Sequence, residues 1–314
     1  MASLRDVVPV LRSFGTWAFL KRIWQQISED GIFVWASALA YSWLFSVFPF
    51  LILLLSLVPY LPLSTKESAH RVIAGFITSM LGSAAYTLND NIDSVMLQPR
   101  RGWLIVGLAV SVWVASGGMS MTISALDKCY DVKIGRSYVR QRALAIALTL
   151  GVAVCMLLII ILLPIGEGVE AWMRYQHLAA PPVIWAFNAA RYGLSFVLAM
   201  FVLSIIYYFG PAIRQRFQLL SPGALFSAVV WIVLDLAFRF YIDRFARYDQ
   251  TYGAVGGVAI LLLFFYIDGL VLLIGAEINS EIDFERLGVP AGSHDFTGPA
   301  KITLPGLPEM SQEL

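Results

Sequence analysis

Charged residues inside apolar stretches are the features of this sequence that could do chemistry. The stretch GGVAILLLFFYIDGLVLLIGAEINSE, residues 256–281, is almost entirely hydrocarbon, yet it carries Asp268 at its centre and Glu277 nine residues later. Two earlier apolar stretches contain three more charged residues, Arg191, Asp235 and Arg239. A charge at the centre of a membrane helix costs roughly 2.5–3.5 kcal/mol, so such groups usually face a partner or water. They either fix helix packing as ion pairs or line a polar translocation route.

Asp235 has two candidate partners. At 1.5 Å per residue, Asp235 lies about 5 Å to the outer side of the centre of its stretch, and Arg191 about 7 Å to the same side of its own. Arg239 follows Asp235 by four residues and therefore shares its helical face. We expect a charge pair that fixes two neighbouring helices, with a polar lining for a translocation route as the alternative.

Asp268 lies about 4–5 Å to the cytoplasmic side of the centre of its stretch, a depth at which the other predicted spans offer no Lys or Arg. On a wheel of about 100° per residue, Gly257, Asp268, Gly275 and Asn279 fall within about 20° of one another, and Glu277 points to the opposite side. Small residues let another helix approach closely or leave room for water. Asp268 is either neutral and hydrogen-bonded, or ionised in a cavity open to the cytoplasm.

Glu277 and Pro49 are interpreted as residues that shape the helices and not as parts of a substrate path. Glu277 lies at the inner end of its stretch, where we expect its carboxylate to reach water and to contact basic residues of a neighbouring loop. Pro49 interrupts the first apolar stretch, and because it removes a main-chain hydrogen bond, it predicts a kink in that helix.

No arrangement of residues indicates catalysis. The three histidines, His70, His177 and His294, fall in an outer helix, an outer loop and the tail, so they cannot converge on a metal ion. The two cysteines form no metal or redox motif. We find neither a Ser-His-Asp arrangement nor a Gly-rich phosphate loop. The sequence therefore predicts no enzyme activity, no catalytic residue and no cofactor.

The elements that position these residues are membrane helices. Of 314 residues, 59% are hydrophobic and 14% are charged, and the mean hydropathy of +0.74 is typical of a membrane protein. The net charge of +1 gives no argument for a nucleic-acid partner. An apolar helix needs about 20 residues to cross the hydrocarbon core, and six stretches satisfy this length. They are roughly residues 33–58, 103–124, 141–164, 183–209, 222–241 and 253–276, of which the fifth is the most interrupted by charge.

We predict an all-α integral membrane protein with a six-span membrane domain over residues 31–286. Most Lys and Arg residues of the short connections fall on one side of six spans, which predicts that both termini are cytoplasmic. Residues 1–30 predict an N-terminal cytoplasmic or interfacial helix, because one face gathers Trp17, Leu20, Trp24 and Ile27 beside Lys21 and Arg22. A short soluble amphipathic lead-in is the alternative. Residues 64–99 predict an outer amphipathic helical hairpin, and residues 287–314 a disordered cytoplasmic tail.

Three stretches resemble the YihY/BrkB family of bacterial inner-membrane proteins: ASALAYSWLFSVFPFLILLLSLVPYL, SALDKCYDVKIGRSYVRQRALAI, and the region from YYFGPAIRQRF to IGAEINSE. The most specific elements are Ala-Leu-Ala-Tyr and Phe-Pro around Tyr41 and Pro49, Tyr252-Gly253, and Gly275 to Glu277. The resemblance covers roughly residues 14–285. It implies integral membrane proteins that once carried the label ribonuclease BN, regarded as mistaken, some linked to virulence or to lipid-related transport. A small or hydroxyl residue is expected in relatives where this chain has Asp268.

The predicted function is transport or handling of an amphiphilic, lipid-like substrate in the bacterial cytoplasmic membrane. A non-transporting scaffold or envelope assembly factor is the alternative, and an RNA-processing enzyme is a distant third. The predicted partners are membrane lipids, with a homo-oligomer left open and no nucleic acid. The candidate pathway residues are Asp268, Asp235, Arg191, Arg239, Glu277 and Asn279, and the candidate packing residues are Gly257, Gly275 and Pro49.

Overall fold

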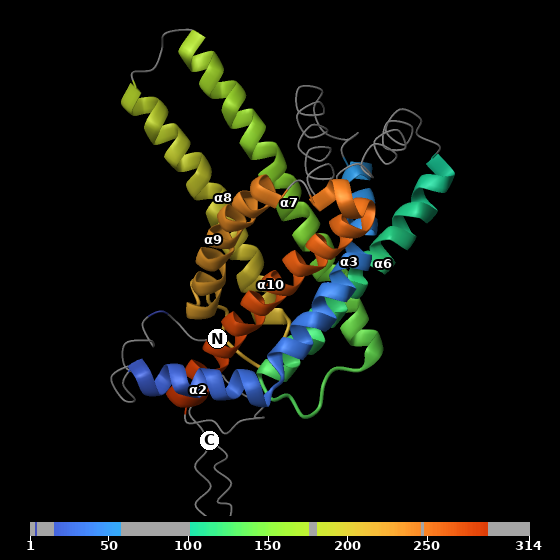
Figure 1. The fold of residues 1–314 in the computed structure, drawn as a ribbon, viewed down its shortest axis with the longest axis vertical. Coiled ribbons are helices and arrows are strands. Elements are labelled where there is room, and N and C mark those ends of the chain that lie inside the picture. The colour runs from blue at the N-terminus through green and yellow to red at the C-terminus, as the bar shows by residue number, and fades with distance from the viewer. Residues whose placement is uncertain (1–3, 5–15, 58–100, 176–180, 246–247, 288–314) are drawn as a thin grey trace, which may run out of the picture.

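A computed structural model describes residues 4, 16–57, 101–175, 181–245 and 248–287, and this part of the chain is all-helical (Figure 1). Its helices, in chain order, are α2 (Thr16–Glu29), α3 (Ile32–Leu57), α6 (Arg101–Cys129), α7 (Tyr138–Tyr175), α8 (Pro181–Phe209), α9 (Pro222–Phe245) and α10 (Tyr248–Leu287). The predicted outer hairpin at 64–99 and the tail from residue 288 onward lie outside the described residues.

Five helices in the described part of the chain are long and apolar enough to cross a membrane: α3, α6, α7, α8 and α10. The sixth predicted span corresponds to α9, of which a shorter apolar stretch, Pro222–Leu234, is found among the described residues, so the count of six remains a prediction. Only 28–39% of each candidate span is buried inside the protein. The remaining apolar surface faces outward, as expected for helices whose solvent is hydrocarbon.

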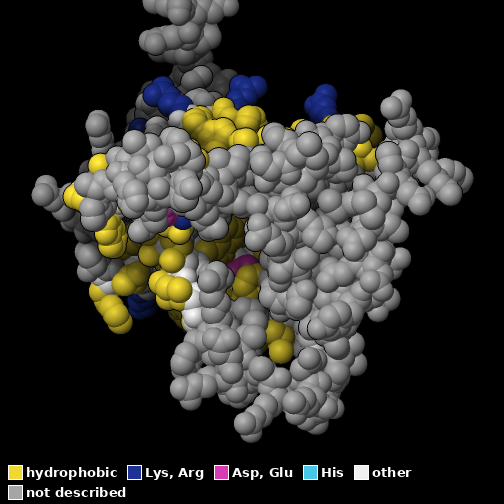
Figure 2. Space-filling model, turned by 90° about the horizontal axis from the view of Figure 1, so that it is seen from above, with side chains coloured by type: hydrophobic (Ala, Val, Ile, Leu, Met, Phe, Trp, Pro, Cys, Tyr) yellow, Lys and Arg dark blue, Asp and Glu magenta, His cyan; other side chains and the backbone are white. Residues whose placement is uncertain are grey.

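Two helices extend well past their predicted spans. At 1.5 Å per residue, α7 with 38 residues is about 57 Å long and α10 with 40 residues about 60 Å, against about 30 Å for the hydrocarbon core. In Figure 1, the far end of α7 and the start of α8 project beyond the other helices. Seen from that end, the described side chains that show are mostly hydrophobic, with Lys and Arg toward the edge (Figure 2). Helix α3 continues through Pro49 to Leu57.

Helix α3 packs closely between α6 and α10 (Figure 1). Against α6 the contact is polar at two points: Gly118 N donates to Ser46 Oγ over 2.8 Å, and Trp43 Nε1 donates to Thr122 Oγ1 over 3.0 Å. A Cβ at position 118 would lie 2.9 Å from Ser46 Oγ, so only glycine allows this approach. Such small-residue contacts are how membrane helices bring their backbones together.

Helices α8, α9 and α10 meet at Gly275. The Tyr207 hydroxyl of α8 is fully buried there; it donates to the Leu272 main-chain oxygen over 2.7 Å and lies 2.8 Å from Ser227 Oγ of α9. Ser227 Oγ also lies 3.1 Å from the main-chain oxygen of Val271. A Cβ on Gly275 would overlap the Tyr207 and Ser227 side chains and lie 2.8 Å from the Gly223 oxygen. Three helices are therefore joined by hydroxyl groups around one glycine.

Helix α2 lies across one end of the bundle, which we call the α2 end (Figure 1). Its buried face, Phe19, Ile23 and Ile27, packs into the main core. A second apolar stripe remains uncovered, with Trp17 80%, Leu20 58% and Trp24 61% exposed. Ile27, which was predicted to share a face with these three residues, lies at the edge of the stripe and is buried in the core.

We expect Gly275→Ala to lower the stability of the protein, because the added methyl group meets a main-chain oxygen that cannot move aside. Overpacking of this kind costs about 1–3 kcal/mol. The matched control is Gly151→Ala in α7, where a Cβ meets no atom within 4 Å and the loss of a helical glycine should be neutral or stabilising. Thermal unfolding of both variants in detergent measures the difference. Equal melting temperatures would contradict the packing described for Gly275.

Candidate functional site

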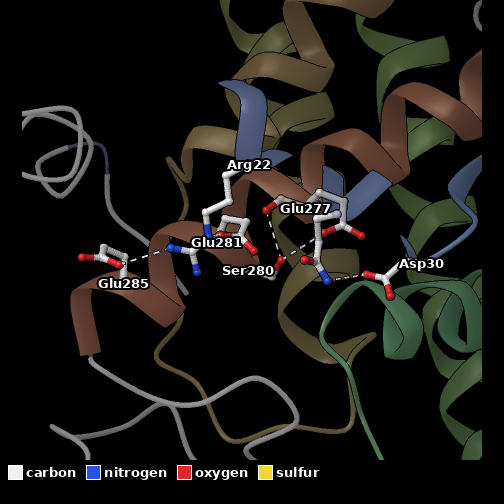
Figure 3. Close-up of polar contacts among 7 residues, drawn as sticks. Arg22, Asp30, Glu277, Ser280, Glu281 and Glu285 are labelled. Carbon is white, nitrogen blue, oxygen red and sulfur yellow. Dashed lines mark hydrogen bonds and ion pairs between the residues drawn. The ribbon is translucent and has the colours of Figure 1, made fainter. Parts of the chain in front are cut away.

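Charged residues join four helices at the α2 end. Lys128, at the end of α6, lies 2.7 Å from Asp30, which links α2 to α3, and 3.9 Å from Asp131. Arg22 of α2 lies 2.6 Å from Glu281 and 3.5 Å from Glu285 of α10 (Figure 3). Burial raises the pKa of the Asp131 carboxyl, and the neighbouring Asp30 adds to that rise. This charged layer fixes α2 against the ends of α6 and α10.

Glu277 lies on the inner side of the charged layer, close to Asp30 and Ser280 in Figure 3. The prediction that it reaches water is wrong, because the residue is fully buried. Among the described residues it forms no ion pair with a loop cation: Lys128 pairs with Asp30 and Arg22 with Glu281. Its Oε2 lies 3.5 Å from Ser280 Oγ, and its Oε1 has no hydrogen-bond partner in this part of the chain. Helix α10 extends past Glu277 to Leu287, and α2 covers the end that was expected to be wet.

Asn279 acts as a cap for α9. Its Oδ1 accepts a hydrogen bond from Gly223 N over 2.8 Å, and its Nδ2 donates to Ser221 Oγ over 3.2 Å. Ser221 Oγ in turn accepts from Ala224 N. The first main-chain N–H groups of a helix have no partner within the helix, and here α10 supplies one of the acceptors. Because Asn279 is fully buried, its polar groups are used for helix packing.

The connection between α6 and α7 holds the end of α8. Arg136 donates hydrogen bonds to the main-chain oxygens of Gly210 and Pro211 over 2.5 and 2.8 Å. Asp127 Oδ1 accepts from Ala212 N over 2.6 Å. A guanidinium at a helix C-terminus satisfies carbonyl groups that have no helical partner. The sequence showed Arg136 only as one of several loop cations, so this contact could not have been predicted.

The other predicted residues do not gather into one polar path in the described part of the chain. Asp268 is half-buried, it is not isolated, and its main-chain oxygen accepts a hydrogen bond from Trp231 Nε1 over 3.4 Å. Arg191 is buried, with its Nη2 2.8 Å from the Tyr192 hydroxyl. The side chains of Asp235 and Arg239 lie outside the description, so their predicted pairing stays a prediction. Gly257 is half-buried in α10.

An apolar groove lies where α3, α6, α7 and α10 meet. It has a volume of about 310 Å³, is open on one side, and is lined almost entirely by hydrocarbon. Its walls include Ser46 and Phe50 of α3, Met119 of α6, Thr149 and Met156 of α7, and Phe265 of α10. Periodicity could not reveal this groove, because it arises from residues of four helices that are far apart in the chain.

Metal ligands do not cluster in the described residues: no group of three or more His, Cys, Asp or Glu side chains there could hold a metal ion. The three histidines fall outside the described ranges.

The sequence model of the family described as Virulence factor BrkB matches residues 23–295. The chain belongs to the BrkB family. It is 33% identical to the Putative ribonuclease-like protein YfkH of Bacillus subtilis, over 84% of this chain and 94% of that one. It is 23% identical to a UPF0761 membrane protein of Haemophilus influenzae, over 83% and 93%. A UPF0761 membrane protein of Chlorobium limicola is 26% identical over 81% of this chain and 56% of its own length. No solved structure matches.

The predicted family resemblance is therefore confirmed, and the chain is a membrane protein of the BrkB family with several apolar helices. The relatives named UPF0761 are described only as membrane proteins. The ribonuclease-like name of the Bacillus protein has no counterpart in the described geometry, where hydroxyl, amide and ion-pair contacts serve helix packing.

The ion pair between Asp30 and Lys128 predicts a strong coupling. The Asp30 side chain is 3% exposed and that of Lys128 39%, so Lys128→Met should leave an enclosed carboxylate without its cation. We expect a loss of about 1–3 kcal/mol, below the value for a fully buried pair because Lys128 is partly solvated. Asp30→Asn combined with Lys128→Met should regain most of it. Unfolding of the full chain in detergent measures the two single variants, Lys128→Met and Asp30→Asn, and the double variant.

Lys133→Met is the control for loss of a cation, since Lys133 is exposed in the neighbouring connection. Strict additivity of the two single changes would show that Asp30 and Lys128 are not coupled.

Proposed function

We propose that this BrkB-family protein transports or handles a lipid-like amphiphile in the bacterial cytoplasmic membrane, with an acyl chain held in the groove between α3, α6, α7 and α10. The groove itself is the observation that carries the proposal: about 310 Å³ of space, lined by hydrocarbon and open on one side. This is the lower end of the range for small-molecule sites, about 300–1,000 Å³. A groove of this lining within membrane-spanning helices can admit a lipid chain without its passing through water.

The proposal includes six membrane crossings with both ends of the chain in the cytoplasm. Helix α9 has 24 residues and is therefore about 36 Å long, enough to cross the hydrocarbon core although charge interrupts its apolar part. Lys128, Lys133, Arg136 and Arg140 gather near the α2 end, which favours that end as the cytoplasmic one.

Helix α2 is proposed to lie in the cytoplasmic interface of the membrane. Trp17, Leu20 and Trp24 form an exposed apolar stripe beside the face that packs on the bundle. Lys21 is exposed and carries the charge that anionic headgroups attract. Trp is the side chain most at home at the level of the headgroups, since its ring is apolar and its N–H is polar.

A non-transporting scaffold is the second candidate. It is favoured by the contacts of Asn279 and Arg136 at helix ends, because polar groups used there fix the helix arrangement and do not line a path for a substrate. An enzyme of RNA processing is a distant third. The proposal assigns no catalytic residue and no cofactor, and membrane lipids are the proposed partners.

Filling the groove tests the proposal. The full chain is reconstituted in liposomes with a fluorescent phospholipid, and transfer between leaflets is followed by quenching from outside. We expect the protein to speed transfer and Val152→Trp, in the groove wall, to slow it by about tenfold or more, equivalent to about 1.4 kcal/mol of lost binding or barrier. Val154→Trp is the matched control, because Val154 is 54% exposed and lies outside the groove.

Equal slowing by Val152→Trp and Val154→Trp would argue against the groove as the site. If the wild-type protein binds lipid, Val152→Trp weakens that binding, and neither protein transfers lipid, then the protein holds the lipid and does not move it. The absence of both binding and transfer would favour the scaffold.

A further inference from the structure

Arg142 places a positive charge within a candidate membrane span, Tyr138–Ile159. It belongs to the start of α7, but its guanidinium lies over the ring of Trp113 in α6, with Cζ 4.3 Å from the ring centroid. Its Nη2 donates a hydrogen bond to the main-chain oxygen of Trp113. Trp113 is 16 residues, or about 24 Å, from the end of α6 at Cys129, within the candidate span Leu108–Cys129. Arg142 itself lies four residues, about 6 Å, past the start of α7 at Tyr138, so its side chain extends from that helix end along α6 into the candidate span.

This charge forms no ion pair with an acidic residue in the described part of the chain, unlike Lys128 and Arg22 at the α2 end. Its Nε is enclosed and has no hydrogen-bond acceptor in the same part of the chain. A charge at this depth in a membrane is costly unless an opposite charge reaches it. The guanidinium carries five N–H donors in a planar fork that matches the oxygens of a phosphate group.

The same guanidinium borders the apolar groove. A Cβ at Gly117 would lie 4.0 Å from Arg142 Nη1 and 3.8 Å from Oγ of Ser46, a residue of the groove wall. Arg142 and the groove residues Thr149 and Met156 follow one another at intervals of seven on α7, so they share one helical face. Arg142 precedes Thr149 by about 10 Å along the helix axis. On α6 the guanidinium lies beside Trp113 and Gly117, at the level of the groove residue Ala115, so a cation borders the hydrocarbon-lined space.

We propose that Arg142 binds the headgroup phosphate of an anionic phospholipid whose acyl chain lies in the groove. This inference rests on the proposed function, because it names the class of lipid that the same groove takes. One guanidinium neutralises one phosphate. A zwitterionic headgroup brings a second cation, for which the described residues around Arg142 offer no carboxylate. The half-exposed Trp113 ring lies against the guanidinium, holds it in place and adds a cation–π contact.

The test is lipid binding to the full chain in detergent, measured by native mass spectrometry with phosphatidylglycerol and phosphatidylcholine of identical acyl chains. We expect the wild-type protein to retain phosphatidylglycerol about tenfold more strongly. Arg142→Gln should bring the two lipids to within about twofold by weakening only phosphatidylglycerol, and Arg142→Lys should restore part of the preference. Arg140→Gln is the matched control, since Arg140 is exposed, lies two residues earlier and removes the same charge.

The outcomes separate the two proposals. Val152→Trp should weaken both lipids equally, because it fills the space for the acyl chain. If Val152→Trp weakens both but the preference for phosphatidylglycerol survives Arg142→Gln, the assignment of Arg142 is overturned and the groove stands. An equal loss of preference in Arg140→Gln would also overturn it, since charge alone would then suffice. If Val152→Trp affects neither lipid, the proposed function fails.

Discussion

The structure depends on one constraint: main-chain polar groups at helix ends near or within a bilayer must find partners in the protein, because hydrocarbon offers none. The ends of α8 and α9 meet this requirement through side chains, two of which come from distant parts of the chain. Arg136 takes the main-chain oxygens of Gly210 and Pro211, directly after α8, and Asn279 with Ser221 takes the first N–H groups of α9. Each such contact brings a distant segment to a fixed place, so the same bonds that satisfy the backbone also arrange the bundle.

The charged layer and the groove occupy different parts of that arrangement. Ion pairs lie at the α2 end, where partly exposed Arg22 and Lys128 can keep contact with water while Glu281 and Asp30 are enclosed. The groove lies among α3, α6, α7 and α10, where hydroxyl groups such as Ser46 Oγ are already used in helix contacts. Polar groups inside the bundle therefore serve mainly helix packing, and Arg142 differs because its guanidinium lies over Trp113 and close to Gly117, beside the groove.

The long apolar helices could be predicted from apolar length, and their predicted starts lie within five residues of the observed ones, whereas α7 and α10 continue eleven residues past their predicted ends. The side-chain environments could not be predicted. Glu277 was expected in water because nothing in a single helix indicates that α2 and the last turns of α10 enclose it. Asn279 was predicted to belong to a polar face of its helix, because nothing in that helix indicates that the start of α9 packs against it and donates a hydrogen bond to its side chain. Arg142 satisfied the bias of cytoplasmic loops toward Lys and Arg, and this simpler explanation hid its contact with Trp113.

Helix α10 gives the molecule a mechanical property. It is continuous from Tyr248 to Leu287, so one rod carries Phe265 in the groove wall, Gly275 at the junction with α8 and α9, and Glu281 at α2. Gly275 lies between the other two, ten residues from Phe265 and six from Glu281. Because the helix is continuous, the groove wall at Phe265 and the charged layer at Glu281 are joined over 16 residues, about 24 Å, and a tilt of α10 would displace both.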